Sequence, residues 1–361
     1  MICTDLHSTL APILANYEPD QTVVIADEKV PLPPCVSEVI QPTHLLSVSC
    51  SESLKTIETV QTIWDFLLAR QITRSGLVIA IGGGVLTDMA GFAAATYKRG
   101  IRYINVPTTL LAMVDASTGG KTGFNYGGLK NCIGAFYNAE ETIIYPPFLS
   151  SLPSREVLSG FAEMLKTGLV DVRRTDVQCT QEWQLWESLL NYDLEAVDTA
   201  SLTPLIADCV AVKERIVATD PRESGLRKAL NLGHTFGHAL EELSLTASMA
   251  SGLSTLSVSG LLHGYAVLYG LIAELYLSVT LLDCPREPLR QLTQIMLHYY
   301  GKPQCKCSDT EQLVALMHRD KKNEHADEIN CTLLRAIGDP VVNYTITDAE
   351  AREAWDYLFS L

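Results

Sequence analysis

Two histidines, an asparagine and an arginine occur in the segment LRKALNLGHTFGHALEE at spacings that one helix would align. They are Arg227, Asn231, His234 and His238, separated by four, three and four residues. On a helix these intervals form a single stripe. Exposed helix faces usually carry Glu and Lys, so this stripe indicates a functional face in preference to a solvated one. Histidines at i and i+4 also have a common metal-ligand spacing, which makes His234 and His238 candidate ligands.

Three more ionisable residues stand in sequences typical of helices. Glu163 and Lys166 are one turn apart on the flank of SGFAEMLKTGLV, and spacing alone favours an ordinary surface ion pair. His263 lies in the uncharged run GLLHGYAV. An isolated histidine of this kind is more often a hydrogen-bonded core residue, unless other ligands converge on it.

Two glycine-rich segments are candidates for phosphate binding. Gly82–Gly84 stands between an expected strand and an expected helix, where backbone amides can approach a phosphate. It lacks the G-x-G-x-x-G pattern, and a tight strand-to-helix turn explains it equally well. Gly119–Gly123 (GGKTG) is similar to part of a P-loop, but Asp115 occupies the position where that motif requires glycine. The sequence therefore argues against nucleotide hydrolysis.

The secondary structure expected around these residues differs between the two halves of the chain. Short apolar runs alternate with helical patterns in the first half, which predicts a parallel sheet wrapped by helices. The expected strands are Gln21–Asp27, Thr43–Ser49, Gly76–Gly84 and Arg102–Thr109, and the expected helices are Leu54–Arg70 and Leu86–Thr96.

Long helical patterns dominate after about residue 150. They cover Glu156–Val170, Leu202–Ala218, Lys228–Leu243, His263–Leu281 and Arg286–Tyr299, with one late strand expected near Ile329–Leu334. The sequence thus predicts an α/β domain over residues 1–150 and a mainly helical domain over residues 151–361. Sites in two-domain proteins of this kind commonly lie in the cleft between the domains.

The composition indicates a large folded protein with an acidic surface. Hydrophobic residues make up 47% and charged residues 19% of the 361 residues, enough for two substantial cores. The net charge of −15 disfavours nucleic acid and anionic membranes as partners, and an anionic small molecule would need a local basic pocket. The ten cysteines are scattered without a C-x-x-C pair, as expected in a reducing cytosol.

Two segments bear on targeting. The N-terminal MICTDLHSTL has an acid at Asp5 and no basic n-region, so we expect no signal peptide. No charged residue occurs between Glu242 and Glu274. The Ser/Thr/Gly-rich Ser244–Gly260 is expected to be a loop, and the apolar half that follows a buried helix rather than a membrane span. We therefore expect a cytoplasmic protein.

Five strings, in chain order, resemble the 3-dehydroquinate synthase family. They are GGGVLTDMAGFAAATYKRGIRYINVPTTLLAMVDASTGGKTGFNYGGLKNCIGAF, GFAEMLKTGL, LRKALNLGHTFGHALE, LHGYAV and RDKKN. The resemblance extends from about Asp27 to Gly338 and is specific, because several long and unusual strings occur together. It implies an α/β N-terminal NAD-binding domain, a mainly α-helical C-terminal metal-binding domain and a homodimer.

The resemblance also implies a metal site. The family's zinc ligands, for which cobalt is a substitute, match Glu163, His234 and His263, in place of the pair His234 and His238 that spacing suggests. One glutamate and two histidines leave positions open for substrate and water. His238 matches a histidine on the substrate side of the metal.

Binding residues for NAD and substrate follow from the same resemblance. The NAD contacts match Asp27, Glu52, Lys55, Gly84, Val85, Leu86, Thr87, Asp88, Thr108, Thr109, Lys121, Lys130, Phe148, Leu149, Ser150 and Ser151. The substrate contacts match Asp115, Lys121, Asn131, Lys166, Lys213, Arg227, Asn231 and His238. Arg99 matches an arginine that reaches the substrate phosphate of a neighbouring subunit.

The sequence departs from the family pattern at several positions. Lys29 stands where the family often has Asn, and Tyr265 stands where the family has the Glu of H-G-E. Because His263 is kept, the resemblance still implies bound zinc. Lys321 and Lys322 of RDKKN, taken without the resemblance, would be a solvated basic patch.

The implied reaction converts 3-deoxy-D-arabino-heptulosonate 7-phosphate to 3-dehydroquinate and phosphate, a step of aromatic amino acid biosynthesis. It proceeds by NAD-dependent transient oxidation, phosphate elimination, reduction and intramolecular aldol closure, and it regenerates NAD. One alternative is another sugar-phosphate cyclase, although Lys213 and Arg227 fit a substrate that carries a carboxylate. A second is a metal-dependent polyol dehydrogenase, which would release NADH. A non-catalytic binding protein is disfavoured, because the zinc positions and the polar stripe are all present.

Overall fold

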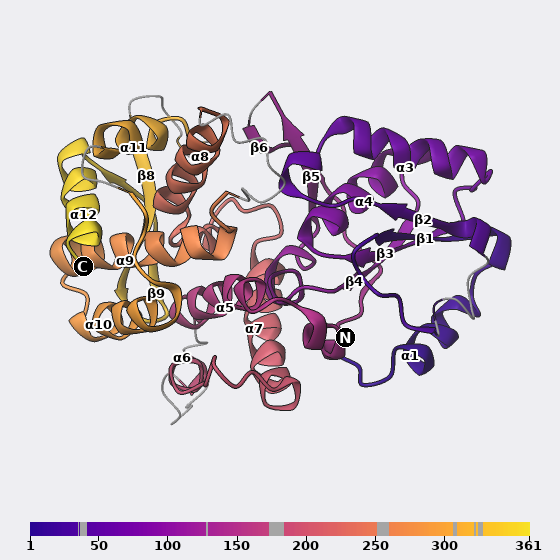
Figure 1. The fold of residues 1–361 in the computed structure, drawn as a ribbon, viewed down its shortest axis with the longest axis horizontal. Coiled ribbons are helices and arrows are strands. Elements are labelled where there is room, and N and C mark those ends of the chain that lie inside the picture. The colour runs from indigo at the N-terminus through magenta and orange to yellow at the C-terminus, as the bar shows by residue number, and fades with distance from the viewer. Residues whose placement is uncertain are drawn as a thin grey trace. The chain divides into compact units, whose positions relative to one another are not determined.

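The computed structural model describes residues 1–34, 36, 42–127, 129–172, 184–250, 260–305, 309–320, 323 and 328–361. The chain divides into two compact units (Figure 1). The N-terminal unit is Met1–Pro153 with Thr199–Thr203, and the C-terminal unit is Ser154–Asp198 with Pro204–Leu361. The roles that the sequence assigns to residues 1–150 and 151–361 remain predictions.

A five-stranded parallel sheet forms the centre of the N-terminal unit (Figure 1). Its strands are β1 (Thr22–Asp27), β2 (Leu45–Val48), β3 (Leu77–Gly82), β4 (Arg102–Pro107) and β7 (Glu141–Thr142), in the order β2-β1-β3-β4-β7. β3 and most of β1 are unbroken apolar runs, because parallel strands that are covered on both faces have no solvated side. The parallel sheet expected from strand–helix alternation is confirmed, and its four expected strands correspond to β1–β4.

Helices α3 (Ile57–Ala69) and α4 (Gly84–Thr96) pack on one face of this sheet. Val60, Ile63 and Leu67 recur at helical spacing on α3 and join residues of α4, β1 and β3 in one buried cluster. The unit also contains α1 (Leu6–Leu14), the 3₁₀ segments η1 (Pro19–Gln21), η2 (Pro42–His44), η3 (Glu52–Leu54), η4 (Tyr97–Arg99) and η6 (Pro146–Ser151), and the π-type turn η5 (Ala112–Ala116).

An antiparallel hairpin that the sequence did not predict follows η5. It consists of β5 (Lys121–Tyr126) and β6 (Leu129–Phe136). β5 lies close against α4, since a Cβ on Gly91 would stand 2.6 Å from Thr122 Cγ2. The GGKTG segment thus leads into a strand, whereas a P-loop leads into a helix.

The C-terminal unit is built around one long buried helix, α9 (His263–Leu282). α9 packs against α5 (Ser154–Leu169), α8 (His234–Ala250), α12 (Asp348–Ser360) and strand β8 (Ile329–Ala336). β8 pairs antiparallel with β9 (Asp339–Ile346). The remaining elements are α6 (Gln184–Leu190), α7 (Thr199–Thr219, of which Thr199–Thr203 are counted with the N-terminal unit), η7 (Leu226–Asn231), α10 (Arg286–Ile295), the π-type turn η8 (Met296–Tyr300) and α11 (Thr310–Met317).

Helix α9 is long and apolar enough to cross a membrane by composition. However, 67% of its most apolar window is buried inside the protein, as in the core helix of a folded domain. The structure therefore agrees with the expected buried helix after residue 260.

Two expectations for the C-terminal unit are wrong. The single helix expected over Lys228–Leu243 is two elements, η7 and α8, because Gly233 between them has a φ of +81°. The loop expected from Ser244 onward is partly helical, since α8 continues to Ala250. The rest of that segment, residues 251–259, lies outside the described residues.

Candidate metal and substrate site

Three side chains that could ligate one metal ion come together in the C-terminal unit. They are Glu163 of α5, His234 at the start of α8 and His263 at the start of α9, with one ligand atom from each within 4.8 Å of the others. Glu163 Oε1 is 3.8 Å from His234 Nε2 and 3.2 Å from His263 Nε2. The ligand set implied by the family resemblance is therefore assembled from three helices.

Glycines let these three helices approach closely enough to converge. A Cβ on Gly264, next to His263, would stand 1.8 Å from the Ser159 carbonyl oxygen of α5. A Cβ on Gly270 of α9 would stand 1.9 Å from the Gly233 carbonyl oxygen, next to His234. No side chain fits at either position, so the backbone packing itself brings the ligand-bearing turns together.

The Nδ1 atom of each ligand histidine, which points away from the cluster, lies near a hydrogen-bond acceptor. His234 Nδ1 lies 3.1 Å from the Leu232 carbonyl oxygen, and His263 Nδ1 lies 3.3 Å from Glu241 Oε1. Carbonyl and carboxylate oxygens only accept, so Nδ1 carries the proton on both rings and Nε2 offers its lone pair. Two imidazole Nε2 atoms and one carboxylate are a donor set that suits zinc, and the residues present fit that ion.

Burial by itself lowers the pKa of His263, but the carboxylates of Glu241 and Glu163 outweigh it and raise the pKa to about 10. The two carboxylates therefore favour positive charge at this place, which a bound metal ion would supply while the ring stays neutral, because only the neutral ring can ligate.

Lys166 and Glu163 form a buried ion pair. Their Nζ and Oε2 atoms are 2.5 Å apart, and the side chains are 1% and 0% exposed. The surface ion pair that spacing alone favoured is therefore wrong. A buried pair survives only where further polar contacts stabilise it, and breaking one partner is costly. The amphipathic pattern of the segment was misleading because α5 has no solvated face here: every residue from Ser159 to Leu169 is buried.

His238 stands one turn along α8 from His234. The two ring centroids are 5.5 Å apart, and the His238 and His263 centroids are 6.5 Å apart. His238 Nδ1 lies 2.9 Å from Asp320 Oδ2, so Nδ1 donates to the carboxylate and Nε2 is the basic atom. The ring is thus oriented beside the ligand cluster, and Asp320 holds it there.

Arg227 and Asn231 do not share a helix with the histidines. Both lie in η7, before the turn at Gly233, so the continuous stripe expected from the sequence is wrong. Arg227 is 2% exposed, and its Nη1 donates to the Pro221 carbonyl at 2.7 Å. Asn231 Nδ2 donates to Glu223 Oε1 at 3.0 Å.

Asp220 organises the loop that leads into η7. Its carboxylate accepts from the backbone amides of Ser224, Gly225 and Arg227 at 3.0, 2.7 and 3.1 Å. Burial favours the neutral carboxyl, but these amide donors outweigh it and lower the pKa of Asp220 to about 2. The remaining expected substrate residue of this unit, Lys213, is buried on α7.

The expected NAD residues of the N-terminal unit lie mainly at the carboxyl edge of its sheet. Asp27 ends β1, the residues Gly84–Asp88 form the first turn of α4 after β3, and Thr108 follows β4. Ligands of open parallel sheets bind at this edge. Phe148–Ser151 lie in η6, and Lys121 and Lys130 lie on the β5–β6 hairpin.

The glycine turn between β3 and α4 fits a phosphate group. A Cβ on Gly84 would stand 2.9 Å from Ala116 Cβ, and the Gly82 carbonyl accepts from the Thr108 amide at 3.0 Å. The backbone is thus packed tightly where α4 presents its N-terminal amides. Thr108 Oγ1 is buried and makes no hydrogen bond within the described residues, which leaves a polar atom available to a ligand.

The other expected contact residues of this unit lie in or next to η3, α4, η4, η5 and β6. Lys55 Nζ lies 2.6 Å from Asp88 Oδ2, and both side chains are largely buried. Asp115 lies in η5, and Asn131 lies in β6 with a φ of +50°. Arg99 also has a positive φ, +68°, at the end of η4.

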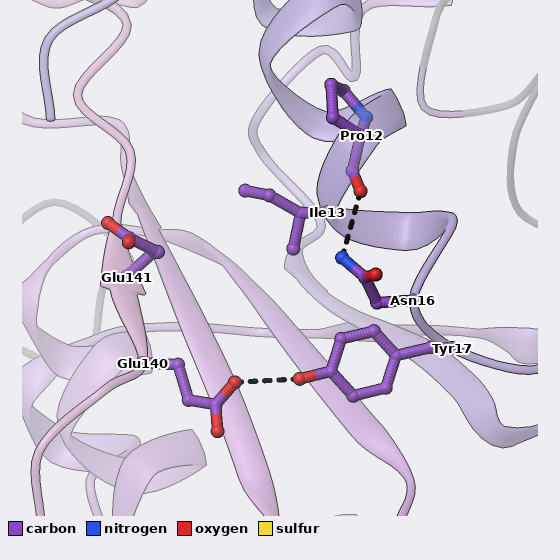
Figure 2. Close-up of a pocket in the computed structure, with 6 residues that line it drawn as sticks. All are labelled: Pro12, Ile13, Asn16, Tyr17, Glu140 and Glu141. Atoms are coloured by element: carbon purple, nitrogen blue, oxygen red, sulfur yellow. Dashed lines mark hydrogen bonds between the residues drawn. The ribbon is translucent and has the colours of Figure 1, made fainter.

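A separate hollow of the N-terminal unit lies away from these residues. It is lined by Pro12, Ile13, Asn16, Tyr17, Glu140 and Glu141 (Figure 2). The Tyr17 hydroxyl donates to Glu140 Oε2 at 2.7 Å across it. None of its residues was expected in the site. Lys321 and Lys322 lie outside the described residues.

Sequence reasoning missed the acidic residues that orient the site. Glu241 follows His234 by seven residues, and the sequence pattern does not distinguish it from Glu242. Asp320 stands in RDKKN, a string that resembles the family, but its own role was not assigned. Only the fold brings these carboxylates to the histidines.

A parallel-sheet α/β unit followed by a helical unit is the fold of the solved sugar-phosphate cyclases. One solved example is 2-epi-5-epi-valiolone synthase from Streptomyces hygroscopicus with NAD⁺ and Zn²⁺ bound. It is 27% identical, with a TM-score of 0.78 over 100% of this chain and 96% of that chain. A 2-deoxy-scyllo-inosose synthase complexed with carbaglucose-6-phosphate, NAD⁺ and Co²⁺ has the same TM-score at 20% identity, over 98% and 94% of the two chains, and shows the fold alone.

Within this class, the chain belongs to the 3-dehydroquinate synthase family. The family's N-terminal sequence model matches residues 45–159, and its C-terminal model matches residues 160–323. A 3-dehydroquinate synthase of Parabacteroides distasonis is 39% identical over 361 residues, 99% of this chain and 96% of that protein. The family resemblance and the fold class expected from the sequence are confirmed.

Proposed function

We propose that the protein is a 3-dehydroquinate synthase, a phosphate-eliminating lyase that forms 3-dehydroquinate from 3-deoxy-D-arabino-heptulosonate 7-phosphate. The observation that carries the proposal is the convergence of Glu163, His234 and His263 beside Lys166 and His238, in a chain of this family. These positions are the ones that the family resemblance marks as ligands and substrate contacts.

The C-terminal unit holds the metal. Glu163, His234 and His263 would ligate zinc, or cobalt in its place, while Glu241 and the Leu232 carbonyl fix the two rings. Bound zinc would polarise the hydroxyl that is oxidised, and bound NAD would supply reversible hydride transfer. Among the relatives above, 2-epi-5-epi-valiolone synthase carries NAD⁺ and Zn²⁺, which supports the same pair of cofactors here.

Basic groups of the same unit bind the substrate anions. Lys166, Lys213 and Arg227 are all nearly buried, so their charges act in a medium that screens them weakly. Arg227 presents a planar, two-pronged guanidinium that matches a carboxylate or phosphate. These cations would supply the local basic charge that a protein of net charge −15 needs to attract a doubly anionic substrate.

His238 moves the proton of the reacting hydroxyl. Asp320 keeps a proton on Nδ1, so Nε2 can accept a proton and later return it. A histidine whose other nitrogen is fixed by a carboxylate keeps one tautomer and one orientation, which suits repeated proton transfer in each turnover.

The N-terminal unit holds NAD. The glycine turn and the first turn of α4 would bind its phosphates, and Asp27, at the end of β1, would contact a ribose. Arg99 would reach the substrate phosphate of a second subunit, so the active form is a homodimer. The protein acts in the cytoplasm, with a small anionic sugar phosphate as its substrate.

One assay tests the proposal directly. Purified protein with zinc, NAD and the heptulosonate phosphate should release phosphate with no lasting rise in nicotinamide absorbance. His238→Asn should slow release by about 10²–10⁴-fold, the usual contribution of a general acid–base group. His318→Asn is the matched control, because His318 also pairs with a carboxylate, Asp348, but lies outside the cluster. Stoichiometric NADH would instead indicate a polyol dehydrogenase, and no phosphate release would refute the proposal.

A further inference from the structure

Asn125, which is not among the expected site residues, connects two parts of the N-terminal unit. Its backbone amide donates to the Lys55 carbonyl at 2.8 Å, and its Nδ2 donates to Glu52 Oε1 at 2.8 Å and to the Glu52 carbonyl at 3.3 Å. Its Oδ1 accepts from the Asn131 amide at 2.8 Å. One half-buried residue of β5 therefore contacts both the Glu52–Lys55 turn and strand β6.

The hydrogen-bonding capacity of the Asn125 side chain is matched to these partners. The amide nitrogen has two donors, and both face oxygen atoms of Glu52. The amide oxygen faces a backbone donor, the N–H of Asn131. An aspartate would keep the contact to Asn131 but would place oxygen against the two oxygens of Glu52. The pattern therefore specifies an amide at position 125.

The contact with Asn131 has a conformational consequence. Asn131 has a φ of +50°, in the left-handed region that a non-glycine residue occupies only when its surroundings hold it. Asn125 Oδ1 accepts a hydrogen bond from the backbone amide of that same residue. Asn125, which is bonded to the turn expected to contact NAD, thus helps to hold the backbone of Asn131, the hairpin residue expected to contact substrate.

We propose that Asn125 is a positioning residue that couples NAD binding to substrate binding. NAD orders the Glu52–Lys55 turn, the turn fixes the Asn125 amide, and Asn125 fixes Asn131. The inference rests on the proposed function, because that function assigns Glu52 and Lys55 to NAD and Asn131 to the substrate. By thermodynamic linkage, each ligand must then tighten the binding of the other by the same factor.

The test measures NAD affinity by calorimetry with and without a phosphonate analogue of the substrate. In this analogue a carbon atom replaces the ester oxygen of the substrate, so the analogue cannot eliminate phosphate. We expect the analogue to tighten NAD binding in the wild type by about fivefold or more, and by less than about twofold in Asn125→Ala and Asn125→Asp. Asn16→Asp adds the same charge to an exposed position of this unit and should keep the wild-type factor.

A polarity exchange separates positioning from simple damage. In the pair Asn125→Asp with Glu52→Gln, the amide introduced at position 52 can donate to the carboxylate introduced at position 125, which restores the bond with its direction reversed. The double variant should recover coupling that Asn125→Asp alone loses, with Glu52→Gln alone as the reference. Thermal unfolding of each variant identifies any that fail to fold. If Asn125→Ala does not fold, the test uses Asn125→Asp, which keeps the shape of the side chain.

The outcomes distinguish this inference from the proposed function. Equal coupling in the wild type and in a folded Asn125→Asp protein would overturn the inference. Phosphate release by the wild type would still support the proposed function. A wild type that binds both ligands without coupling also overturns only the inference. A wild type that binds neither NAD nor the analogue overturns both.

Discussion

Glu241→Gln should weaken zinc binding although Glu241 is not a ligand. Glu241 Oε1 accepts from His263 Nδ1 at 3.3 Å, and the carboxylate side chain is 3% exposed. The charged acceptor keeps the ring in the tautomer that leaves Nε2 free, and it makes that nitrogen a stronger ligand. Glutamine has the same shape but no charge, so it removes the electrostatic part of this contact and little of the packing.

The size of the effect follows from the kind of contact that is lost. Hydrogen bonds to charged groups contribute about 1.5–3 kcal/mol, and at 1.4 kcal/mol per factor of ten that corresponds to roughly 10–150-fold in affinity. Loss of a residue that orients a metal ligand typically costs about 10–100-fold in metal affinity. We therefore expect the zinc dissociation constant of Glu241→Gln to rise by about 10–100-fold.

The adjacent Glu242 supplies a matched control. Its side chain is 42% exposed and faces Arg319 at 3.8 Å, so Glu242→Gln removes the same charge one residue away without touching the cluster. Competition with a chromogenic chelator gives zinc affinity without any catalytic assay. Equal zinc affinity in Glu241→Gln and Glu242→Gln would refute the argument that Glu241 orients His263.

Three further outcomes are expected. Arg227→Lys should keep the fold and zinc but lose at least about tenfold in kcat/KM, roughly 1.4 kcal/mol, and near-normal kinetics would exclude Arg227 from anion binding. Mixed dimers of Arg99→Ala and Lys166→Ala chains should regain activity that neither homodimer has, because one of their two sites has both Arg99 and Lys166. If activity does not recover despite confirmed subunit exchange, Arg99 lies in the site of its own chain or outside the site. The pKa of Asp220, about 2 when folded against its usual 3.8, means that its stabilising ionised form is lost as the pH falls through this range. Asp220→Asn should therefore flatten the acid-induced loss of stability of the zinc-free protein, measured by urea unfolding between about pH 4 and about pH 2, and an unchanged acid limb would contradict this.

Local sequence was sufficient where one element carries its own signal. The apolar runs of β1 and β3 and the helical spacing of apolar residues over Leu54–Arg70 predicted the parallel sheet and a helix that covers it. The long strings around Gly82, Glu163 and His234 carry the family resemblance by themselves. Hydrophobic burial is set by patterns over a few residues, so these conclusions did not need distant contacts.

The sequence was misleading where a distant residue sets the local conformation. Glu274 Oε2 accepts from the Gly233 amide at 2.6 Å, and the Gly233 backbone packs against Gly270 of α9. These contacts stabilise the turn that separates Arg227 from His234, yet they join residues about forty positions apart. Periodicity could not reveal the turn, because helical spacing continues across it.

The sequence by itself determined the fold class and the family and, through the family resemblance, the three candidate ligands. Short apolar patterns and long contiguous strings were sufficient for these conclusions. Only the tertiary structure decided which groups surround those ligands. Glu163 and Lys166 form a buried pair, and Glu241, not Glu242, faces His263. The ionisation and orientation of a side chain depend on the dielectric and on charges within a few ångströms, and packing between distant segments fixes both.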